Sequence, residues 1–459
     1  MTRSISLLLL AAAAFAQDAA TLDDLARRNR ELEERVRRLE STALSEDVAR
    51  YLEERLPAEG ADGAESILPG GRSIRITGEI RIREEIKDRL YAPMDPGGAE
   101  SFDFAHMRTR LRFDIDVLEN LAAVVELQDI RTLGEEGSTT ADTEGVDLKR
   151  GTIVFRNLGG HDLTVEAGRF VMVYGDQRLI GHLEWFDQGR TYDGVRGMFK
   201  GEKYWIDAFA VRVRETVTPD DDQWFVGVYG GREWLEAYAL LFADDMAMAG
   251  EVGTDDTMFV TVGFRIARTS GDWDYTTEVA FQTGDVKGDD LGAFAFAVVV
   301  GRTFPDVRWA PRIALEIDYA SGDDDPTDGD SGQFQTLYPT NHLHYGYADL
   351  VGWSNILDIH VRFQLKPLEK VVVEIGVHHF LRPEEAGGWV NAGGAVVRPG
   401  LAGASDHLGD EVDFTVTWKP SKALSFLVGY SIFVPGGFVE DTGASPTAHL
   451  AYLETRVVW

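Results

Sequence analysis

The sequence predicts an all-β fold, namely a transmembrane antiparallel β-barrel of about 18 strands preceded by a short N-terminal helical coiled-coil segment. Three observations predict it. The chain begins with an export signal, most of it alternates apolar and polar residues, and it ends in an alternating segment that closes on Trp459. A period of two residues is typical of β-strands. Together these features indicate a wall of strands whose first and last members must pair.

Residues 1–16 have the features of a secretory signal peptide. Arg3 precedes an apolar run from Ile5 to Ala14, and Ala14-Phe15-Ala16 has the small-x-small pattern of a cleavage site. This run is too short to cross a bilayer as a stable helix, and no later segment approaches the about 20 apolar residues that a spanning helix needs. We therefore expect an exported protein that crosses a membrane only with strands.

Residues 17–56 are expected to form a periplasmic coiled-coil helix. Core-type positions recur at alternating three- and four-residue steps among Arg and Glu: Leu22, Leu25, Asn29, Leu32, Val36, Leu39 and Ala43. A buried amide at Asn29 would fix register and oligomer state, so we expect a homo-oligomer through this segment. The alternative is one amphipathic helix that lies on the rest of the protein. Residues 57–72, with their prolines and glycines, are the expected linker.

Residues 73–459 are predicted to form the outer-membrane β-barrel. In Ser73–Arg83, isoleucines occupy one face and charged residues the other, and Met107–Val117 and Ser354–Lys366 repeat this pattern. In a transmembrane barrel the apolar face contacts lipid and the polar face lines the lumen, whereas in a soluble sandwich the apolar face is the core. Short breaks such as Glu119-Asn120 alternate with long polar segments such as Ser321–Leu350. These unequal connections favour the membrane barrel, which is wide enough for an aqueous channel unless loops occlude it.

Composition excludes several function classes. The chain has no cysteine and a formal net charge of -32, so it lacks both disulfides and the basic footprint that nucleic acid requires. We find no nucleophile motif such as Gly-x-Ser-x-Gly and expect no enzyme activity. The minor alternative is an embedded hydrolase, as some outer-membrane barrels are. No cofactor is expected. The acidic loop Asp323–Asp330 is a possible divalent-cation site, although solvated loop acids are the alternative interpretation. His378 and His379 fall on opposite faces of one strand, so this pair cannot chelate one metal ion.

Several polar motifs recur in the barrel region. They are Thr164–Arg169, Tyr174–Leu179, Gly189–Arg196, Phe334–His342, Tyr345–Asp349, Asn355, Asn391–Gly394, Gly409–Asp413, Gly429-Tyr430 and Pro435–Gly437. In this order they resemble the alginate export family of outer-membrane porins over most of residues 73–459. The resemblance implies an eighteen-stranded barrel that exports a uronic-acid polymer through an arginine-rich constriction. The N-terminal heptads and the electronegative loop acids are not part of that pattern.

Inward-facing arginines are the predicted binding groups, because a planar, permanently charged donor fork suits carboxylates. The residues that we predict to face the solute, partly by resemblance, are Arg81, Arg108, Arg110, Arg169, Arg190, Arg196 and Arg362. The alternative role is bracing of the wall by cross-strand ion pairs. The expected function is a passive outer-membrane channel for anionic saccharides, alginate-like uronic-acid polymers or oligomers, or related small anions. The alternative is a non-transporting barrel that tethers the envelope through a periplasmic partner of its coiled coil.

The final strand completes the predicted wall. Its alternation places Trp459 toward lipid at the periplasmic rim and Glu454 and Arg456 toward the channel. We expect it to close the barrel against Ser73–Arg83. The expected location is the outer membrane of a Gram-negative-type bacterium, with lipid as the partner of the outer surface.

Overall fold

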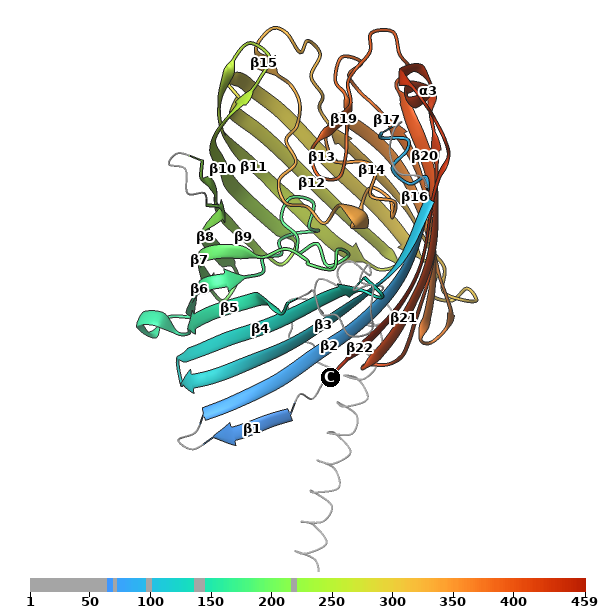
Figure 1. The fold of residues 1–459 in the computed structure, drawn as a ribbon. Coiled ribbons are helices and arrows are strands. Elements are labelled where there is room, and N and C mark those ends of the chain that lie inside the picture. The colour runs from blue at the N-terminus through green and yellow to red at the C-terminus, as the bar shows by residue number, and fades with distance from the viewer. Residues whose placement is uncertain (1–63, 69–71, 96–100, 136–144, 216–220) are drawn as a thin grey trace, which may run out of the picture.

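The computed structural model describes residues 64–68, 72–95, 101–135, 145–215 and 221–459. The predicted signal peptide and coiled-coil helix therefore lie outside the described residues. The described chain forms one closed wall of oblique strands (Figure 1). Among the described residues, none of the helices is both long and apolar enough to cross a membrane.

Eighteen antiparallel strands make up the wall, as the sequence predicts. They are β2 (Arg72–Asp88), β3 (Ser101–Leu118), β4 (Leu121–Thr132), β5 (Asp147–Phe155), β6 (Leu163–Phe170), β7 (Tyr192–Lys200), β8 (Trp205–Arg214), β9 (Gln223–Arg232), β10 (Leu235–Ala249), β11 (Thr254–Ser270), β12 (Trp273–Val286), β13 (Asp289–Thr303), β14 (Arg312–Ala320), β16 (Ile356–Leu368), β17 (Val371–Leu381), β20 (His407–Ser421), β21 (Leu424–Pro435) and β22 (Ala448–Val458).

Shorter elements decorate the wall. They are β1 (Ala64–Leu68), β15 (Asp330–Ser331), β18 (Trp389–Val390), β19 (Val396–Arg398), the 3₁₀ helices η1 (Leu158–Gly160) and η2 (Asn341–Leu343), and α3 (Gly437–Thr442). Strand β1 lies within the segment that we expected to be linker and pairs with the first residues of β2.

The barrel closes between its first and last strands. Strand β22 pairs with Glu79–Asp88 of β2, which is further along β2 than the expected segment Ser73–Arg83. Trp459 and Gly78 exchange backbone hydrogen bonds of 2.9 and 3.0 Å. The indole of Trp459 lies where a Cβ on Gly78 would be, at 2.3 Å, so only glycine allows this close approach. Trp459 thus extends the pairing between the last strand, β22, and the first strand of the wall, β2.

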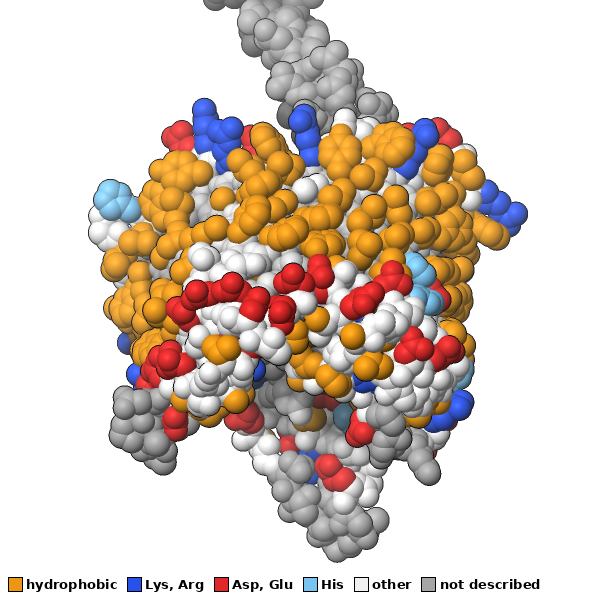
Figure 2. Space-filling model, turned by 90° about the horizontal axis from the view of Figure 1, so that it is seen from above, with side chains coloured by type: hydrophobic (Ala, Val, Ile, Leu, Met, Phe, Trp, Pro, Cys, Tyr) orange, Lys and Arg blue, Asp and Glu red, His pale blue; other side chains and the backbone are white. Residues whose placement is uncertain are grey.

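The two faces of the wall have the polarity that the alternation predicts. On β2, Ile80 is 38% exposed on the outside, whereas its neighbour Arg81 is 4% exposed on the inside. Figure 2 shows hydrophobic side chains forming a broad belt over the outer wall, with acidic side chains gathered along one border of the belt. The polar residues face the lumen because side chains alternate across a strand.

The connections differ between the two rims. Short turns, such as 119–120 and 422–423, lie at the rim where the chain ends, and long connections lie at the other. Two long connections, residues 171–191 and 332–355, run inside the ring of strands (Figure 1). They are joined to each other by the bridge between Ile180 and Tyr338. They supply much of the buried apolar core, including Met172, Phe334, Tyr345 and Trp353. The lumen is therefore filled by the protein's own loops at this level.

Candidate functional site

A group of arginines on β2 and β3 forms one side of the lumen. We call Arg81, Arg83, Arg108 and Arg110 the arginine wall. Arg81 lies directly opposite Arg108 in the strand register, and Glu79 lies opposite Arg110. Like charges directly opposite each other destabilise a strand pair unless other groups neutralise them. This wall therefore requires acidic partners.

Glu79 of β2 pairs with Arg108 at 2.6 Å, and the 171–191 loop supplies further acidic partners. Glu184 accepts from Arg110 at 2.6 Å and lies 2.9 Å from Arg108, and Asp187 pairs with Arg81. Backbone carbonyls of the same loop accept from Arg81 at 2.7 Å and from Arg83 at 2.6 Å. Although burial opposes its ionisation, Arg108 and Arg110 hold the pKa of the Glu184 carboxyl well below its usual range. Glu184 is thus an ionised internal carboxylate on the arginine wall.

The carboxylates of a different part of the lumen form a second wall. We call Glu316, Asp318, Asp358, Glu411 and Asp413, on β14, β16 and β20, the acidic wall. Each of them is 3% exposed or less. Arg178 of the 171–191 loop donates to Asp318 at 2.7 Å and to the Tyr345 hydroxyl at 3.1 Å, and it also pairs with Glu316. Arg362 approaches Glu316 at 3.4 Å. Within the described part of the chain, the carboxylates of this wall outnumber the arginines that contact them.

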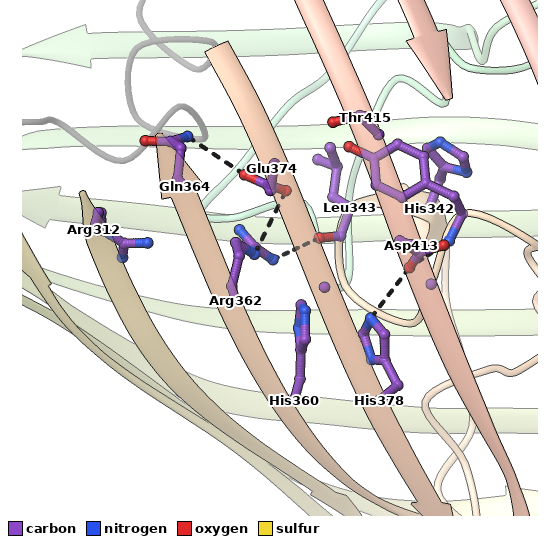
Figure 3. Close-up of a pocket in the computed structure, with 13 residues that line it drawn as sticks. Arg312, His342, Leu343, His360, Arg362, Gln364, Glu374, His378, Asp413 and Thr415 are labelled. Atoms are coloured by element: carbon purple, nitrogen blue, oxygen red, sulfur yellow. Dashed lines mark hydrogen bonds and ion pairs between the residues drawn. The ribbon is translucent and has the colours of Figure 1, made fainter. Parts of the chain in front are cut away.

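The remaining predicted arginines have different roles. Arg190 holds the two inner loops together, because it donates to the carbonyls of Gly181 at 3.1 Å and Pro339 at 2.8 Å. Arg196 faces the lumen and pairs with Glu166 at 2.6 Å. Figure 3 shows Arg362 between Glu374 and the carbonyl of Leu343. These residues brace the wall and the loops, as the alternative interpretation anticipated.

Arg169 does not face the lumen, and here the sequence-based expectation is wrong. On β6, Glu166 and Phe170 point inward. Arg169 is an odd number of positions from both, so its side chain points outward. Arg169 pairs with Asp193 at 2.8 Å, and their side chains are 37% and 54% exposed. The motif that contains Arg169 matched the family pattern, but its position in the alternation places it on the outer surface.

A cavity of about 620 Å³ lies between the arginine wall and the long connections. Among its lining residues are Arg83, Lys87, Phe104, His106 and Trp185. Lys87 Nζ lies 4.8 Å from the ring centroid of Phe104. The guanidinium carbon of Arg83 lies 4.1 Å from the ring centroid of Trp185. The lining also carries the carboxylates of Glu85, Glu135, Asp147, Asp187 and Asp349, and Glu85 pairs with Arg83 at 2.6 Å and with Lys87 at 2.9 Å. Cations next to aromatic faces suit a ring-shaped solute whose carboxylate competes with these acids.

Two groups of functional residues were not recognised in the sequence. Arg178 lies within the motif Tyr174–Leu179, but its acidic partners are 138 and 140 residues away. His360 and His378 lie on adjacent strands and meet only because β16 and β17 pair. Among the Asp323–Asp330 acids, Asp323 is buried beside Glu251 and most of the others are exposed. Cation binding by this loop stays a prediction.

Solved structures share this fold, and they include the outer membrane protein OpdK of Pseudomonas aeruginosa. The structure of Pseudomonas aeruginosa OccK2 (OpdF) in complex with glucuronate matches with a TM-score of 0.55 and 10% identity, covering 84% of this chain and 97% of that chain. Pseudomonas aeruginosa OpdK with vanillate matches with a TM-score of 0.53 and 10% identity, over 84% and 98%. Acinetobacter baumannii OccAB3 matches with a TM-score of 0.52 and 11% identity, over 84% and 99%. The search for similar curated proteins gave no match.

The sequence itself carries the family assignment. Residues 72–452 match the alginate export family, and this range covers nearly the whole barrel. The match confirms the resemblance that the polar motifs indicated. Family and fold point to a transport channel rather than an enzyme. The chain belongs to the alginate export family of outer-membrane β-barrel porins.

Proposed function

We propose that this protein is a passive, selective outer-membrane channel for anionic saccharides of the uronate type, alginate-like polymers or oligomers. The observation that carries this proposal is the convergence of Arg81, Arg108 and Arg110 on the carboxylates of Glu184 and Asp187. The arginine wall thus already binds carboxylates, and Glu184 and Asp187 belong to a loop, whereas Glu79, which also pairs with Arg108, belongs to strand β2. A solute carboxylate can replace the loop carboxylates without leaving any arginine unpaired.

Exchange of one carboxylate for another explains how such a channel can be both selective and fast. Each arginine would always have an acidic partner, so the cost of an unpaired buried charge is avoided during passage. Binding at each point must stay weak so that the solute can leave. A neutral sugar cannot take the place of Glu184 and would find the arginine wall closed.

Two further observations support an anionic saccharide. The cavity beside the arginine wall combines Lys87 and Arg83 with aromatic rings. The solved OccK2 complex, which shares the fold, contains glucuronate, and the OpdK complex contains vanillate. Both ligands carry a carboxylate on a ring.

Single-channel recording in planar bilayers tests the proposal. We expect uronate oligomers to interrupt the ion current of the wild-type channel, while neutral oligosaccharides of the same length leave it unchanged. Arg108→Ala with Arg110→Ala should abolish that difference, because the exchange site is lost. Arg169→Ala is the matched control, since it removes an arginine from the outer surface. Current that is indifferent to uronates in the wild type would overturn the proposal.

The second candidate function is a non-transporting barrel that tethers the envelope. The observation that favours it is the filled lumen, in which residues 171–191 and 332–355 pack against each other and the wall. A wild-type barrel that inserts into the bilayer and carries no ion current would support the tether and exclude the channel.

A further inference from the structure

We propose that Asp358, His360 and His378 form a binding site for a divalent transition-metal ion in the lumen wall. One ligand atom from each residue lies within 4.8 Å of the ligand atoms of the other two. Two imidazoles and a carboxylate are a ligand set that suits Zn²⁺ and similar ions, whereas Ca²⁺ and Mg²⁺ prefer oxygen ligands only. The site does not depend on which solute the channel carries.

The strand register brings the ligands together. His360 on β16 lies directly opposite His378 on β17, and Asp358 precedes His360 by two positions on the same inward face. The two imidazole rings are 3.6 Å apart between centroids. Figure 3 shows both histidine side chains pointing toward the same cavity, next to Asp413. The backbone pairing therefore fixes the positions of all three side chains.

A buried oxygen without a partner points to a ligand. Asp358 is fully buried, and its Oδ1 makes no hydrogen bond within the described part of the chain. Its other oxygen, Oδ2, lies 2.8 Å from His378 Nδ1. Buried polar atoms are nearly always paired, so an unpaired carboxylate oxygen beside two imidazoles calls for a cation. A metal ion held by Asp358 and His378 would satisfy it.

Groups around the ligands also suit a metal ion. Asp413 Oδ2 lies 3.6 Å from His378 Nε2, and Glu316 Oε2 lies 3.4 Å from His360 Nδ1. Carboxylates behind ligating histidines are typical of metal sites, because they orient the ring and strengthen it as a ligand. A small cavity of about 30 Å³ next to His360 and His378 has room for a water molecule as a further ligand. The ion would also offset the excess of carboxylates on the acidic wall.

A second group of the same composition lies on the other side of the strand. His379, His407 and Asp410 also have ligand atoms within 4.8 Å of one another. Their side chains are between 31% and 45% exposed, and each imidazole already lies beside a carboxylate oxygen of Asp410, at 2.7 Å for His379 and 3.2 Å for His407, so no fully buried oxygen is left for an ion. The adjacent histidines His378 and His379 thus belong to separate groups, in agreement with the expectation that they cannot share one metal ion. The experiment must separate the two groups.

Calorimetric titration with Zn²⁺ tests the proposal on the full folded barrel. The background variant His379→Ala with His407→Ala removes the outer group, and it should still bind one Zn²⁺ per chain. In this background, Asp358→Asn and His378→Ala should each weaken binding by more than about 100-fold, and Asp413→Asn by about 10- to 100-fold, as expected of a carboxylate behind a ligand. His161→Ala, at a short turn, is the control and should bind as the background does.

Two outcomes would overturn the site. One is a background variant that binds no Zn²⁺, and the other is unchanged affinity in His378→Ala. If the ligand variants fail to fold, the absorption spectrum of Co²⁺ added to the background variant tests the site instead. This variant retains Asp358, His360 and His378. Visible bands of nitrogen-coordinated Co²⁺ support the proposal, and a spectrum identical to that of free Co²⁺ contradicts it.

Discussion

The arginine wall and the acidic wall arise from the same strand periodicity but carry opposite charge, and one loop serves both. Residues 171–191 present Glu184 and Asp187 to the arginine wall and Arg178 to the acidic wall. The loop therefore connects the two walls. Its acidic end, Glu184 and Asp187, contacts the arginine wall, and its basic end, Arg178, contacts the acidic wall. Opposite charges on the two walls fix its orientation, since reversing the loop would place like charges together.

The acidic and basic ends of the 171–191 loop differ in their access to solvent. The Glu184 side chain is 27% exposed, whereas that of Arg178 is 1% exposed. A solute carboxylate can therefore compete for the arginine wall while the contact at the acidic wall stays closed. We infer that the basic end anchors the loop and the acidic end is the part that responds to solute.

Removing the anchor should have the largest effect on the barrel. Arg178→Met leaves Glu316 and Asp318 buried without their strongest partner, and breaking such a buried pair typically costs about 3–5 kcal/mol of unfolding free energy. Guanidinium unfolding of the barrel in detergent measures this loss. Arg169→Met breaks an exposed pair on the outer surface and should cost about 0–1 kcal/mol. Equal losses in the two variants would contradict the distinction between an anchored and an exposed arginine.

Changing the acidic end should alter selectivity more than stability. Glu184→Gln keeps the shape of the side chain but leaves Arg108 and Arg110 with less negative charge, so the lumen becomes more attractive to anions. We expect the reversal potential under a KCl gradient to shift toward the chloride potential. The loss of unfolding free energy should be smaller than in Arg178→Met, at about 1–3 kcal/mol.

The control for this selectivity change is Glu202→Gln at an exposed short turn, which should leave the reversal potential where it is in the wild type. A Glu184→Gln channel that folds and keeps the wild-type potential would show that the arginine wall does not control permeation.

Local patterns were sufficient to predict the wall. The period of two residues placed Ile80 outside and Arg81 inside, and the unequal connections predicted the two rims. The same rule, applied to β6, places Arg169 outside, so that error came from giving the family motif more weight than the alternation. Strand periodicity decides which face a residue occupies, and a motif does not.

The contents of the lumen could not be predicted in this way. Arg108 was expected to face solute, but it is 1% exposed because the 171–191 loop covers it. Contacts such as that of Arg178 with Asp318 join residues 140 positions apart, and no local periodicity encodes them. Loop packing depends on the whole set of side chains in the lumen. Sequence therefore predicted which side chains point inward but not what they meet there.

The smallest expected effect concerns Glu251, in the connection 250–253 between β10 and β11, which lies beside Asp323 of the connection that follows β14. Partial burial and a hydrogen bond with the Asp323 carboxyl raise the pKa of Glu251 to about 7. Two carboxyl groups can share a hydrogen bond only while one of them is protonated. Because the pKa is raised in the folded state, the proton stabilises the folded loop below the ordinary carboxyl pKa of 4.5, and this contribution is lost as the pH rises through about 7.

Hydrogen exchange of the 323–331 segment, corrected for the intrinsic rate at each pH, measures this effect. Protection should be greater at pH 5 than at pH 8, by about 1 kcal/mol or less, because solvent reaches the site and screens the interaction. Glu251→Gln should remove the pH dependence, since an amide does not titrate. The arginine wall provides the contrast, because Glu184 stays ionised over this range and amides of the 171–191 loop should keep the same protection. If segment 323–331 and the 171–191 loop both lost protection between pH 5 and pH 8, the two segments would respond as one unit. That result would contradict the prediction that only the segment beside Glu251 depends on pH.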